Sequence, residues 1–365
     1  MANKTARLGD LATYINGYAF KPADWGDTGL PIIRIQDLNG NSYQLNRYDG
    51  EYPERIEVND GDVLISWSAS LGVYVWQRGK ALLNQHIFKV VFDKLPVNKE
   101  YFVFAVEHKL AEMESKTHGA TMKHIVKKDF DGTTIPYPHI EKQAEIADHL
   151  RRITSLIDRQ AEQLLLLDQL VKSRFIELFG DPVLNQHGWR KVALEVNATL
   201  LNGRAYKQDE LLDSGKYPVL RVGNFFSNRG WYYSDLELDD DKYCDNGDLL
   251  YAWSASFGPQ IWNGGKVIYH YHIWKVLVGE AYNKQFLCKL LEYATESLMG
   301  DTHGIAMMHL TKSGMEKTEF IVPPIERQEQ FAAFVEQTDK SKLAVQKGLQ
   351  ELEILKKSLM QQYFG

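Results

Sequence analysis

Six histidines stand in matching places of the sequence and are the first candidates for chemistry. Histidine is the commonest metal ligand and acid–base side chain near neutral pH. The pairs are His86 with His272, His118 with His303, and His124 with His309. The chain lacks a His-Glu-x-x-His metal pair, a Gly-x-x-x-x-Gly-Lys-Ser/Thr phosphate loop and the Asn-Pro-Pro-Tyr-like motif of adenine methyltransferases. We therefore expect no catalytic residue and no metal site, and interpret the histidines as fold-keeping positions that donate hydrogen bonds to the backbone or to DNA.

A second group of polar residues has the side-chain types that contact DNA bases and phosphates. Arginine pairs bidentately with guanine, asparagine and glutamine pair with adenine, and serine approaches either base. The candidates in the first half are Lys21, Arg34, Gln36, Ser68, Ser70, Gln85 and His86, and those in the second half are Arg204, Lys207, Arg221, Asn224, Ser254, Ser256 and His272. Residue types differ between the halves, since Gln36 corresponds to Gly223 and Gln85 to Tyr271. We therefore expect the two halves to contact different half-sites of an asymmetric, two-part target.

The motif Trp-Ser-Ala-Ser occurs once in each half, at residues 67–70 and 253–256, after an apolar stretch and before a glycine. Small hydroxyl side chains at such a place would approach a phosphate or a base edge closely, with the tryptophan packed behind them. A tight turn between two core strands explains the same pattern. Both interpretations stay open, and they are compatible with each other.

These candidates lie on a repeat with a period near 186 residues. The stretch from Gly61 to Gly72 returns from Gly247 to Gly258, and the stretch from His86 to Val90 returns from His272 to Val276. The matches extend to Phe179-Gly180 and Phe364-Gly365. A solenoid needs at least three short repeats, so two long copies indicate duplicated domains related by a pseudo-twofold axis.

Each copy begins with a mixed module of about 140 residues. Short β patterns such as Pro31–Ile35 and Val63–Trp67 alternate with helical patterns such as Tyr101–Met113, and turn residues separate them at short intervals. This composition predicts an α/β fold for the module.

Each copy ends in a proline-free stretch of some 40 residues. Apolar residues recur there at steps of three and four, from Ile146 to Leu178 in the first copy and from Phe331 to Tyr363 in the second. Each stretch predicts a helix of about 55–60 Å. Two narrow matching stripes predict that the helices pair as an antiparallel coiled coil, which would separate the two modules by a fixed distance.

The charge balance argues against a free-standing DNA-binding protein. The net charge is −6, residues 1–140 hold 16 basic and 17 acidic side chains, and residues 182–325 hold 14 and 17. Affinity for DNA depends largely on neutralisation of phosphates by lysine and arginine. We therefore expect DNA contact through a local patch, with a partner supplying much of the positive field.

The composition also indicates the cellular compartment in which the protein is expected to work. The chain has 365 residues, of which 44% are hydrophobic, so it is long enough for two domains with cores. No stretch approaches ~18 consecutive apolar residues, and the first five residues contain no apolar signal core. Cys244 and Cys288 lie in the same half, which argues against a disulfide framework and against cysteine-bound zinc. These features predict a soluble, cytoplasmic protein without a membrane partner.

The order module, long helix, module, long helix resembles the specificity subunits of type I restriction-modification systems. Pro-Pro-Ile-Glu-Arg-Gln at 323–328 and Leu-Phe-Gly-Asp-Pro at 178–182, followed by Gly188-Trp189, carry this resemblance across essentially the whole chain. The first helix opens more loosely, with Pro-Tyr-Pro-His-Ile-Glu-Lys-Gln at 136–143. The resemblance implies target-recognition domains at 1–139 and 181–324, and conserved spacer helices at 140–180 and 325–365.

The resemblance also implies a non-catalytic role and a set of partners. In that family the spacer helices dock two methyltransferase subunits, which bring S-adenosylmethionine and flip an adenine out of double-stranded DNA for methylation. Restriction and translocase subunits then add ATP and Mg²⁺ chemistry, so this chain itself would need no cofactor. The alternative is a coiled-coil adaptor with two protein-interaction modules and no DNA contact.

Overall fold

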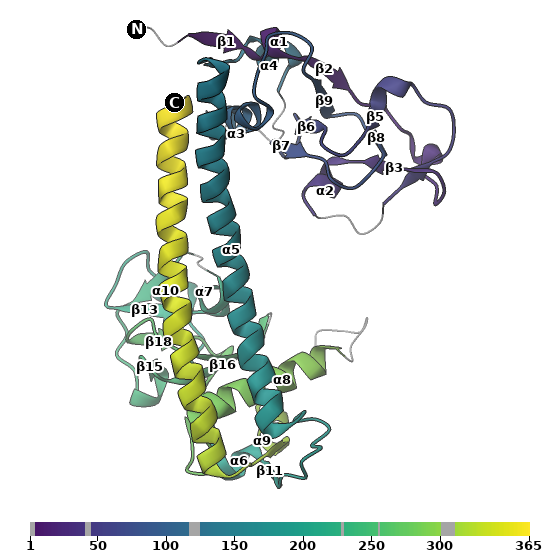
Figure 1. The fold of residues 1–365 in the computed structure, drawn as a ribbon. Coiled ribbons are helices and arrows are strands. Elements are labelled where there is room, and N and C mark those ends of the chain that lie inside the picture. The colour runs from purple at the N-terminus through teal and green to yellow at the C-terminus, as the bar shows by residue number, and fades with distance from the viewer. Residues whose placement is uncertain (1–3, 41–44, 117–124, 228–229, 255, 301–310) are drawn as a thin grey trace. The chain divides into compact units, whose positions relative to one another are not determined.

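The computed structural model describes residues 4–40, 45–116, 125–227, 230–254, 256–300 and 311–365. The chain divides into two compact units, which are described separately (Figure 1). The first unit comprises Met1–Ala161 with Lys347–Gly365, and the second comprises Glu162–Gln346. Each unit therefore contains one module together with parts of both long helices.

The first unit is built on an antiparallel sheet with the strand order β2-β9-β6-β7. Its strands are β2 (Thr13–Asn16), β9 (Ile87–Val91), β6 (Val63–Ser66) and β7 (Gly72–Val75). Alternate residues of a strand point to opposite faces. Accordingly, Val63 and Ile65 join the core that contains α3, whereas Leu64 joins a second core beneath the other sheet. The strand β6 is buried on both faces for this reason.

The second sheet of this unit has the order β4-β3-β8-β5, with β3 and β8 parallel. Its strands are β4 (Arg47–Tyr48), β3 (Leu30–Ile33), β8 (Ala81–Leu83) and β5 (Glu57–Val58), and β1 (Thr5–Arg7) pairs separately with β10 (Thr134–Pro136). The helices of the module are α1 (Leu8–Leu11), α2 (Ile35–Leu38), α3 (Lys99–Lys116) and α4 (Lys127–Gly132). Tyr101 and Phe102 of α3 are fully buried against the first sheet and the long helices.

The second unit repeats this topology strand for strand. Its sheets have the orders β12-β19-β16-β17, β14-β13-β18-β15 and β11-β20. The bounds are β11 (Lys191–Ala193), β12 (Ala198–Asn202), β13 (Tyr217–Leu220), β14 (Tyr232–Ser234), β15 (Tyr243–Cys244), β16 (Leu249–Ser254), β17 (Ser256–Ile261), β18 (Val267–Tyr269), β19 (Ile273–Val278) and β20 (Glu319–Ile321), with α6 (Leu194–Asn197), α7 (Val222–Phe226), α8 (Lys284–Gly300) and α9 (Lys312–Lys317). The predicted α/β class and the predicted duplication are both confirmed.

The two long helices are α5 (Ile140–Phe179) and α10 (Ile325–Phe364), each of 40 residues. In the first unit the Nδ1 atom of His149 lies 3.4 Å from the hydroxyl of Tyr363. A Cβ atom on Gly348 would lie 3.0 Å from the side-chain amide of Gln160. Residue numbers thus rise along one helix as they fall along the other, which makes the pair antiparallel in this unit.

The helices are paired in the same sense within the second unit. Lys342 forms an ion pair with Asp168 at 2.5 Å, so the lysine that interrupts the apolar stripe has a partner on the facing helix. Further along, the guanidinium of Arg174 lies 5.9 Å from the ring of Phe334. The predicted pairing of the two long helices is confirmed in both units.

The start of each long helix is tied to its own module by a buried glutamine. Gln143, which is 1% exposed, accepts a hydrogen bond from the backbone N–H of Asn98 at 2.9 Å and donates one to the carbonyl of Pro138 at 2.9 Å. Gln328 is fully buried, and it likewise accepts a hydrogen bond from the backbone N–H of Asn283 and donates one to the carbonyl of Pro323, both at 2.8 Å. The repeated Ile-Glu-Lys/Arg-Gln phrase therefore fixes the helix to the segment that precedes α3 or α8.

The end of each long helix is buried in the other module. Phe179, at the end of α5, packs its ring 4.6 Å from that of Phe286 in the second unit. Phe364, at the end of α10, packs 5.2 Å from the ring of Tyr101 in the first unit. Both phenylalanines are at most 1% exposed. The repeated Phe-Gly phrase is thus a buried anchor, and each module holds the start of one long helix and the end of the other.

Within the part of the chain that the structure describes, no helix is long and apolar enough to cross a membrane.

Candidate nucleic-acid interface

Four chain segments of the first unit meet where strands of its two sheets end, around residues 18, 33, 67 and 83–86. We call this region the edge of the unit. The backbone N–H of Tyr18 donates to the carbonyl of Leu83 at 2.8 Å, and that of Gln85 donates back to Tyr18 at 2.9 Å. Trp67 donates to His86 at 3.2 Å, which brings in the end of β6. Asn84 likewise donates to Ile33 at 3.2 Å. The predicted site residues of the first half therefore belong to neighbouring segments.

The same four bonds recur in the second unit. Arg204 donates to Tyr269 at 3.0 Å, and Tyr271 donates back to Arg204 at 3.0 Å. Trp253 donates to His272 at 3.0 Å, and His270 donates to Leu220 at 2.9 Å. Backbone atoms make all of these bonds, so they hold the edge together whatever side chains it carries.

The repeated Asn-Gly pair allows the first of these segments to approach so closely. A Cβ atom on Gly17 would overlap the backbone of Leu83 and Asn84, and one on Gly203 would overlap the backbone of Tyr269 and His270. A residue larger than glycine would push the two segments apart. These glycines match between the halves because the backbone contact requires them.

Arg34 is held over the edge of the first unit by a buried carboxylate. Its Nε atom lies 3.3 Å from Oδ2 of Asp37, which is 1% exposed and also accepts from the backbone N–H of Arg34 at 2.8 Å. The guanidinium lies 5.7 Å from the ring of Trp25. Lys21, Gln36 and Gln85 are exposed.

The serines of the first unit are not equivalent. Ser68 is buried, whereas Ser70 is exposed. The segment between β6 and β7 is closed by the hydroxyl of Ser66, which donates to the carbonyl of Ser70 at 2.6 Å. In the second unit β16 and β17 pair along their whole length up to Ser254 and Ser256. Both motifs thus lie at a turn between core strands, and Ser70 and Ser256 are the hydroxyls that reach the surface.

In the second unit the arginine side chains have different partners from that of Arg34 in the first. Arg221 lies with its guanidinium 4.7 Å from the ring of Tyr232. Arg204 makes a two-pronged pair with Glu210, at 2.7 and 2.9 Å, and this pairing lowers the pKa of the Glu210 carboxyl to about 2. Lys207 is exposed, and the side-chain amide of Asn224 donates to the carbonyl of Gly230 at 3.2 Å.

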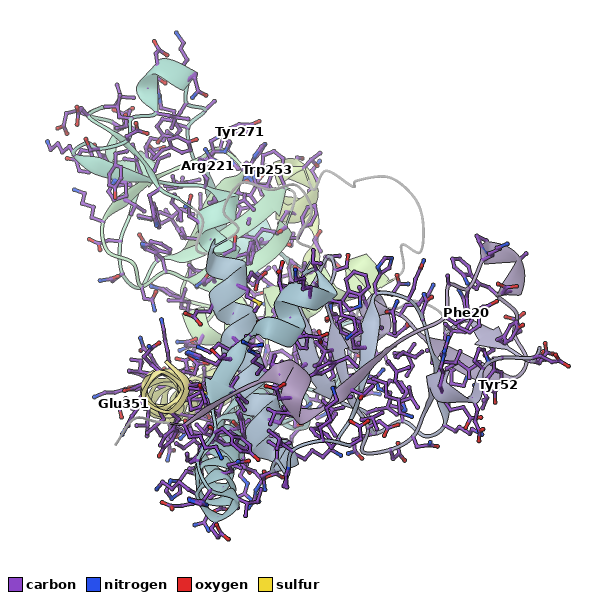
Figure 2. All side chains as sticks on the ribbon, turned by 90° about the horizontal axis from the view of Figure 1, so that it is seen from above. Phe20, Tyr52, Arg221, Trp253, Tyr271 and Glu351 are labelled. Atoms are coloured by element: carbon purple, nitrogen blue, oxygen red, sulfur yellow. The ribbon has the colours of Figure 1, made fainter. Side chains whose placement is uncertain are left out.

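A cluster of aromatic rings forms the centre of the second unit's edge. The ring of His272 lies 3.9 Å from that of Tyr271, 4.8 Å from that of His270 and 5.0 Å from that of Trp253. The indole N–H of Trp253 donates to the carbonyl of Tyr271 at 2.8 Å. Burial, with smaller contributions from His272 and Arg221, lowers the pKa of His270 to about 4, so that imidazole is neutral at pH 7. Figure 2 shows Arg221, Trp253 and Tyr271 together at this edge.

The sequence did not indicate His270 as a member of this cluster; it indicated Tyr271 only as the counterpart of Gln85, and Trp253 only as a ring packed behind the serines. The His-Tyr-His triplet at 270–272 was a usable signal, because its last member had already been matched to His86. Among the matched histidines, His86 and His272 are the pair at the edge, and His86 places its ring 5.0 Å from that of Trp67. His118, His124, His303 and His309 lie outside the described residues.

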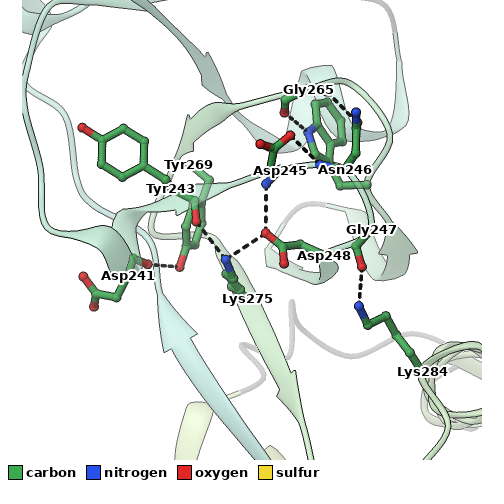
Figure 3. Close-up of polar contacts among 11 residues, drawn as sticks. Asp241, Tyr243, Asp245, Asn246, Gly247, Asp248, Gly265, Tyr269, Lys275 and Lys284 are labelled. Carbon is green, nitrogen blue, oxygen red and sulfur yellow. Dashed lines mark hydrogen bonds and ion pairs between the residues drawn. The ribbon is translucent and has the colours of Figure 1, made fainter.

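Lys89 and Lys275, which lie three residues after His86 and His272, have a structural role. Lys275 donates to Asp248 at 2.8 Å and to the carbonyl of Tyr243 at 3.2 Å, while Asp248 also accepts from the backbone N–H of Asp245 at 2.9 Å (Figure 3). In the first unit Lys89 pairs in the same way with Asp62 at 3.4 Å. The repeated Gly-Asp phrase thus supplies a carboxylate to the sheet and does not belong to the edge.

Cations, amides and aromatic rings on a fixed backbone are suited to binding a polar, anionic surface. The described residues include no group of three or more histidines, cysteines or acidic residues that would hold a metal ion.

Comparisons with known proteins agree with this architecture. The sequence model described as "Type I restriction modification DNA specificity domain" matches residues 2–166 and again 187–354. The chain is 23% identical over 395 aligned residues to the MjaVIII specificity subunit of Methanocaldococcus jannaschii, covering 98% of this chain and 91% of that protein. It is 29% identical over 168 residues to the EcoBI specificity subunit of Escherichia coli, which covers 45% of this chain and 35% of that protein.

Two solved structures have a similar fold. The type I restriction-modification S subunit from M. genitalium aligns with a TM-score of 0.60 at 14% identity, covering 99% of this chain and 96% of that one. A chain from a structure that describes complex assembly and conformational transition of the type I system aligns with a TM-score of 0.59 at 16% identity, covering 99% and 97%.

Proposed function

The chain belongs to the type I restriction-modification DNA specificity family, and from that premise we propose that each unit contacts one half of a two-part DNA target. Specificity subunits of this family are not enzymes, which agrees with the expected non-catalytic role. The protein then selects the site at which other subunits act.

One observation carries the proposal. The edges of the two units share the same backbone hydrogen bonds but present different side chains, with Gln85 in the place of Tyr271 and Gln36 in the place of Gly223. Duplicated core positions would be expected to keep similar packing residues. Different polar and aromatic groups on one scaffold instead suit two different half-sites, because base edges are distinguished by their donors, acceptors and methyl groups.

The partners follow from the same proposal. Two methyltransferase subunits would dock on the long helices, where several apolar side chains are exposed, among them Leu165 at 65%, Leu343 at 68% and Ile354 at 62%. They would bring S-adenosylmethionine and flip the target adenine of double-stranded DNA. Restriction and translocase subunits would bring ATP and Mg²⁺ chemistry, and this chain would hold no cofactor. The complex would work in the cytoplasm, and its other subunits would supply phosphate contacts that a chain of net charge −6 lacks.

The long helices would set the gap between the half-sites. Each runs without interruption for 40 residues, and each is tied to a module by a buried glutamine at its start and a buried phenylalanine at its end. A helix rises 1.5 Å per residue and resists bending over a few turns. The unread spacer of the target would therefore have a fixed length.

Co-expression with the cognate methyltransferase subunit, followed by genome-wide mapping of methylated adenines, tests the proposal. The expected result is one split motif with two defined halves and a constant gap. The matched control is the methyltransferase subunit alone, which should give no motif. Absence of methylation in every context, combined with co-purification of unrelated proteins by the full chain, would instead favour the adaptor alternative.

A further inference from the structure

We infer that Tyr271 determines specificity in the second half-site by packing its ring on the methyl group of a thymine, and that Gln85 takes the corresponding place in the first half-site by pairing with an adenine. This inference rests on the proposed DNA-binding function and assigns a base to one position in each unit. The sequence indicated Tyr271 only as the residue that corresponds to Gln85, with no base assigned to either.

The first step is that the turn carrying Tyr271 is fixed in space. Its backbone N–H donates to Arg204 at 3.0 Å, and its carbonyl accepts from the indole of Trp253 at 2.8 Å. On either side, His270 donates to Leu220 at 2.9 Å and His272 accepts from Trp253 at 3.0 Å. A turn whose backbone is already fixed loses little backbone entropy on binding, which lowers the entropic cost of a contact.

The second step is that the ring of Tyr271 is exposed to solvent although other aromatic rings lie beside it. The residue is 39% exposed at the tip of the turn between β18 and β19. Its ring lies 4.5 Å from that of His270, 3.9 Å from that of His272 and 6.0 Å from that of Trp253. An apolar ring held in this way at the surface is typical of a contact position.

The third step is the comparison with the first unit, where the same turn carries Gln85. The two turns share the backbone bonds, since Gln85 donates to Tyr18 as Tyr271 donates to Arg204. The exposed side chain is an amide in one unit and a phenol ring in the other, and the residue before it is Asn84 in the first unit and His270 in the second. This position therefore changes contact chemistry without changing the fold.

The assignment of bases follows from the chemical groups that each base pair presents in the major groove. Glutamine pairs bidentately with the N6 and N7 atoms of adenine. The C5-methyl of thymine is the one apolar group that a base pair presents in that groove, and it is the natural partner of an apolar ring. Arg221, beside the cluster and stacked on Tyr232, supplies the positive charge that brings the ring against DNA.

The test uses the full complex with its methyltransferase subunits and DNA carrying the mapped site. Tyr271→Ala and Gln85→Ala first identify which half-site each unit contacts. Each thymine of the second half-site is then replaced in turn by deoxyuridine, which lacks only the C5-methyl. Removal of one buried methyl should weaken binding by the wild-type complex about fourfold at a single position. Tyr271→Ala should bind the two DNAs equally.

Three further variants make the test specific. Tyr271→Phe should keep the thymine-over-uracil preference, because the ring and not the hydroxyl makes the contact. Tyr271→Gln should change the preferred base at that position towards adenine and leave the first half-site unchanged. Gln85→Tyr should make the converse change, and the thermal midpoints of all variants control for folding.

Several outcomes would overturn the inference and leave the proposed function standing. These are a split motif whose second half has no A·T pair, equal binding of thymine and uracil by the wild type, and loss of the preference in Tyr271→Phe. Absence of any split motif with the wild-type chain would instead overturn the proposed function itself.

Discussion

Replacing Lys275 by methionine is expected to destabilise the second unit and to leave its DNA contacts unchanged. Lysine side chains commonly neutralise phosphates in DNA-binding proteins. The structure instead places the Nζ atom of Lys275 at 2.8 Å from Asp248 and at 3.2 Å from the carbonyl of Tyr243. The two charged side chains are only 18% and 27% exposed, so water does not fully replace the lost partner.

The magnitude follows from what the substitution removes. Asp248 keeps one hydrogen bond, from the backbone N–H of Asp245 at 2.9 Å, and loses a charged donor. Methionine retains most of the apolar contacts of the lysine stem. A charge-assisted hydrogen bond of this kind contributes about 2 kcal/mol. For a unit of this size that corresponds to a fall in Tm of about 4–8 °C.

The assay has two arms, thermal unfolding of the chain and the salt dependence of DNA binding by the full complex. The control is Lys284→Met, since Lys284 is exposed and its described partner is a neutral group, the carbonyl of Gly247 at 2.7 Å. We expect its Tm to change by less than about 2 °C. An unchanged Tm for Lys275→Met, with a salt slope reduced by about one, would show that Lys275 contacts phosphate and refute the reasoning.

Three other substitutions test the site and the helices. Arg34→Ala and Arg221→Ala should each cost about 1–3 kcal/mol of discrimination at one half-site in competition binding, whereas uniform weakening on all sequences would identify a phosphate contact. Insertion of seven residues into both α5 and α10 should lengthen the methylated motif's gap by about three base pairs, and an unchanged gap would contradict the spacer role. Because the folded pKa of His270 is about 4 and its ordinary value 6.5, the unfolded chain binds more protons between these values, and stability falls as pH drops through that window. His270→Gln should reduce the loss between pH 7 and pH 4.5 in urea unfolding by about 1–2 kcal/mol, less than the full pKa shift corresponds to because solvent screens the partly exposed imidazole, and identical losses in the two proteins would contradict the assignment.

Much of the fold was predictable because its signals are local or repeated. Apolar residues at steps of three and four predicted both long helices, and collinear phrases predicted the duplication. The partner of each helix end was not predictable. Phe179 and Phe364 could be matched to one another in the sequence, but no local pattern indicates that Phe364 packs against Tyr101 and Phe179 against Phe286. Such contacts join residues far apart in the chain.

The site was predictable in its segments and less so in its individual residues. The stretches around Lys21, Arg34, Gln85 and their counterparts do meet at one edge of each unit. Their individual roles as DNA contacts stay predictions, as do the boundaries of the recognition domains. The grouping of Trp253, Tyr271 and His270 in one cluster escaped prediction because residue type alone does not indicate which rings lie together around an exposed turn.

The chemistry of the edge restricts where a new specificity can arise. Gly17 and Gly203 cannot carry a larger side chain without separating two backbone segments, and Asp62 and Asp248 are engaged by lysines within the sheet. The turn that carries residue 85 or 271 is held by backbone hydrogen bonds, to which the side chain of Asn84 adds one bond in the first unit and the indole of Trp253 adds one in the second. An exchange of its exposed side chain therefore costs the fold little, because none of those bonds involves that side chain. Substitutions at this turn should change the base preference with small changes in stability, whereas substitutions at the glycines should lower stability before they alter preference.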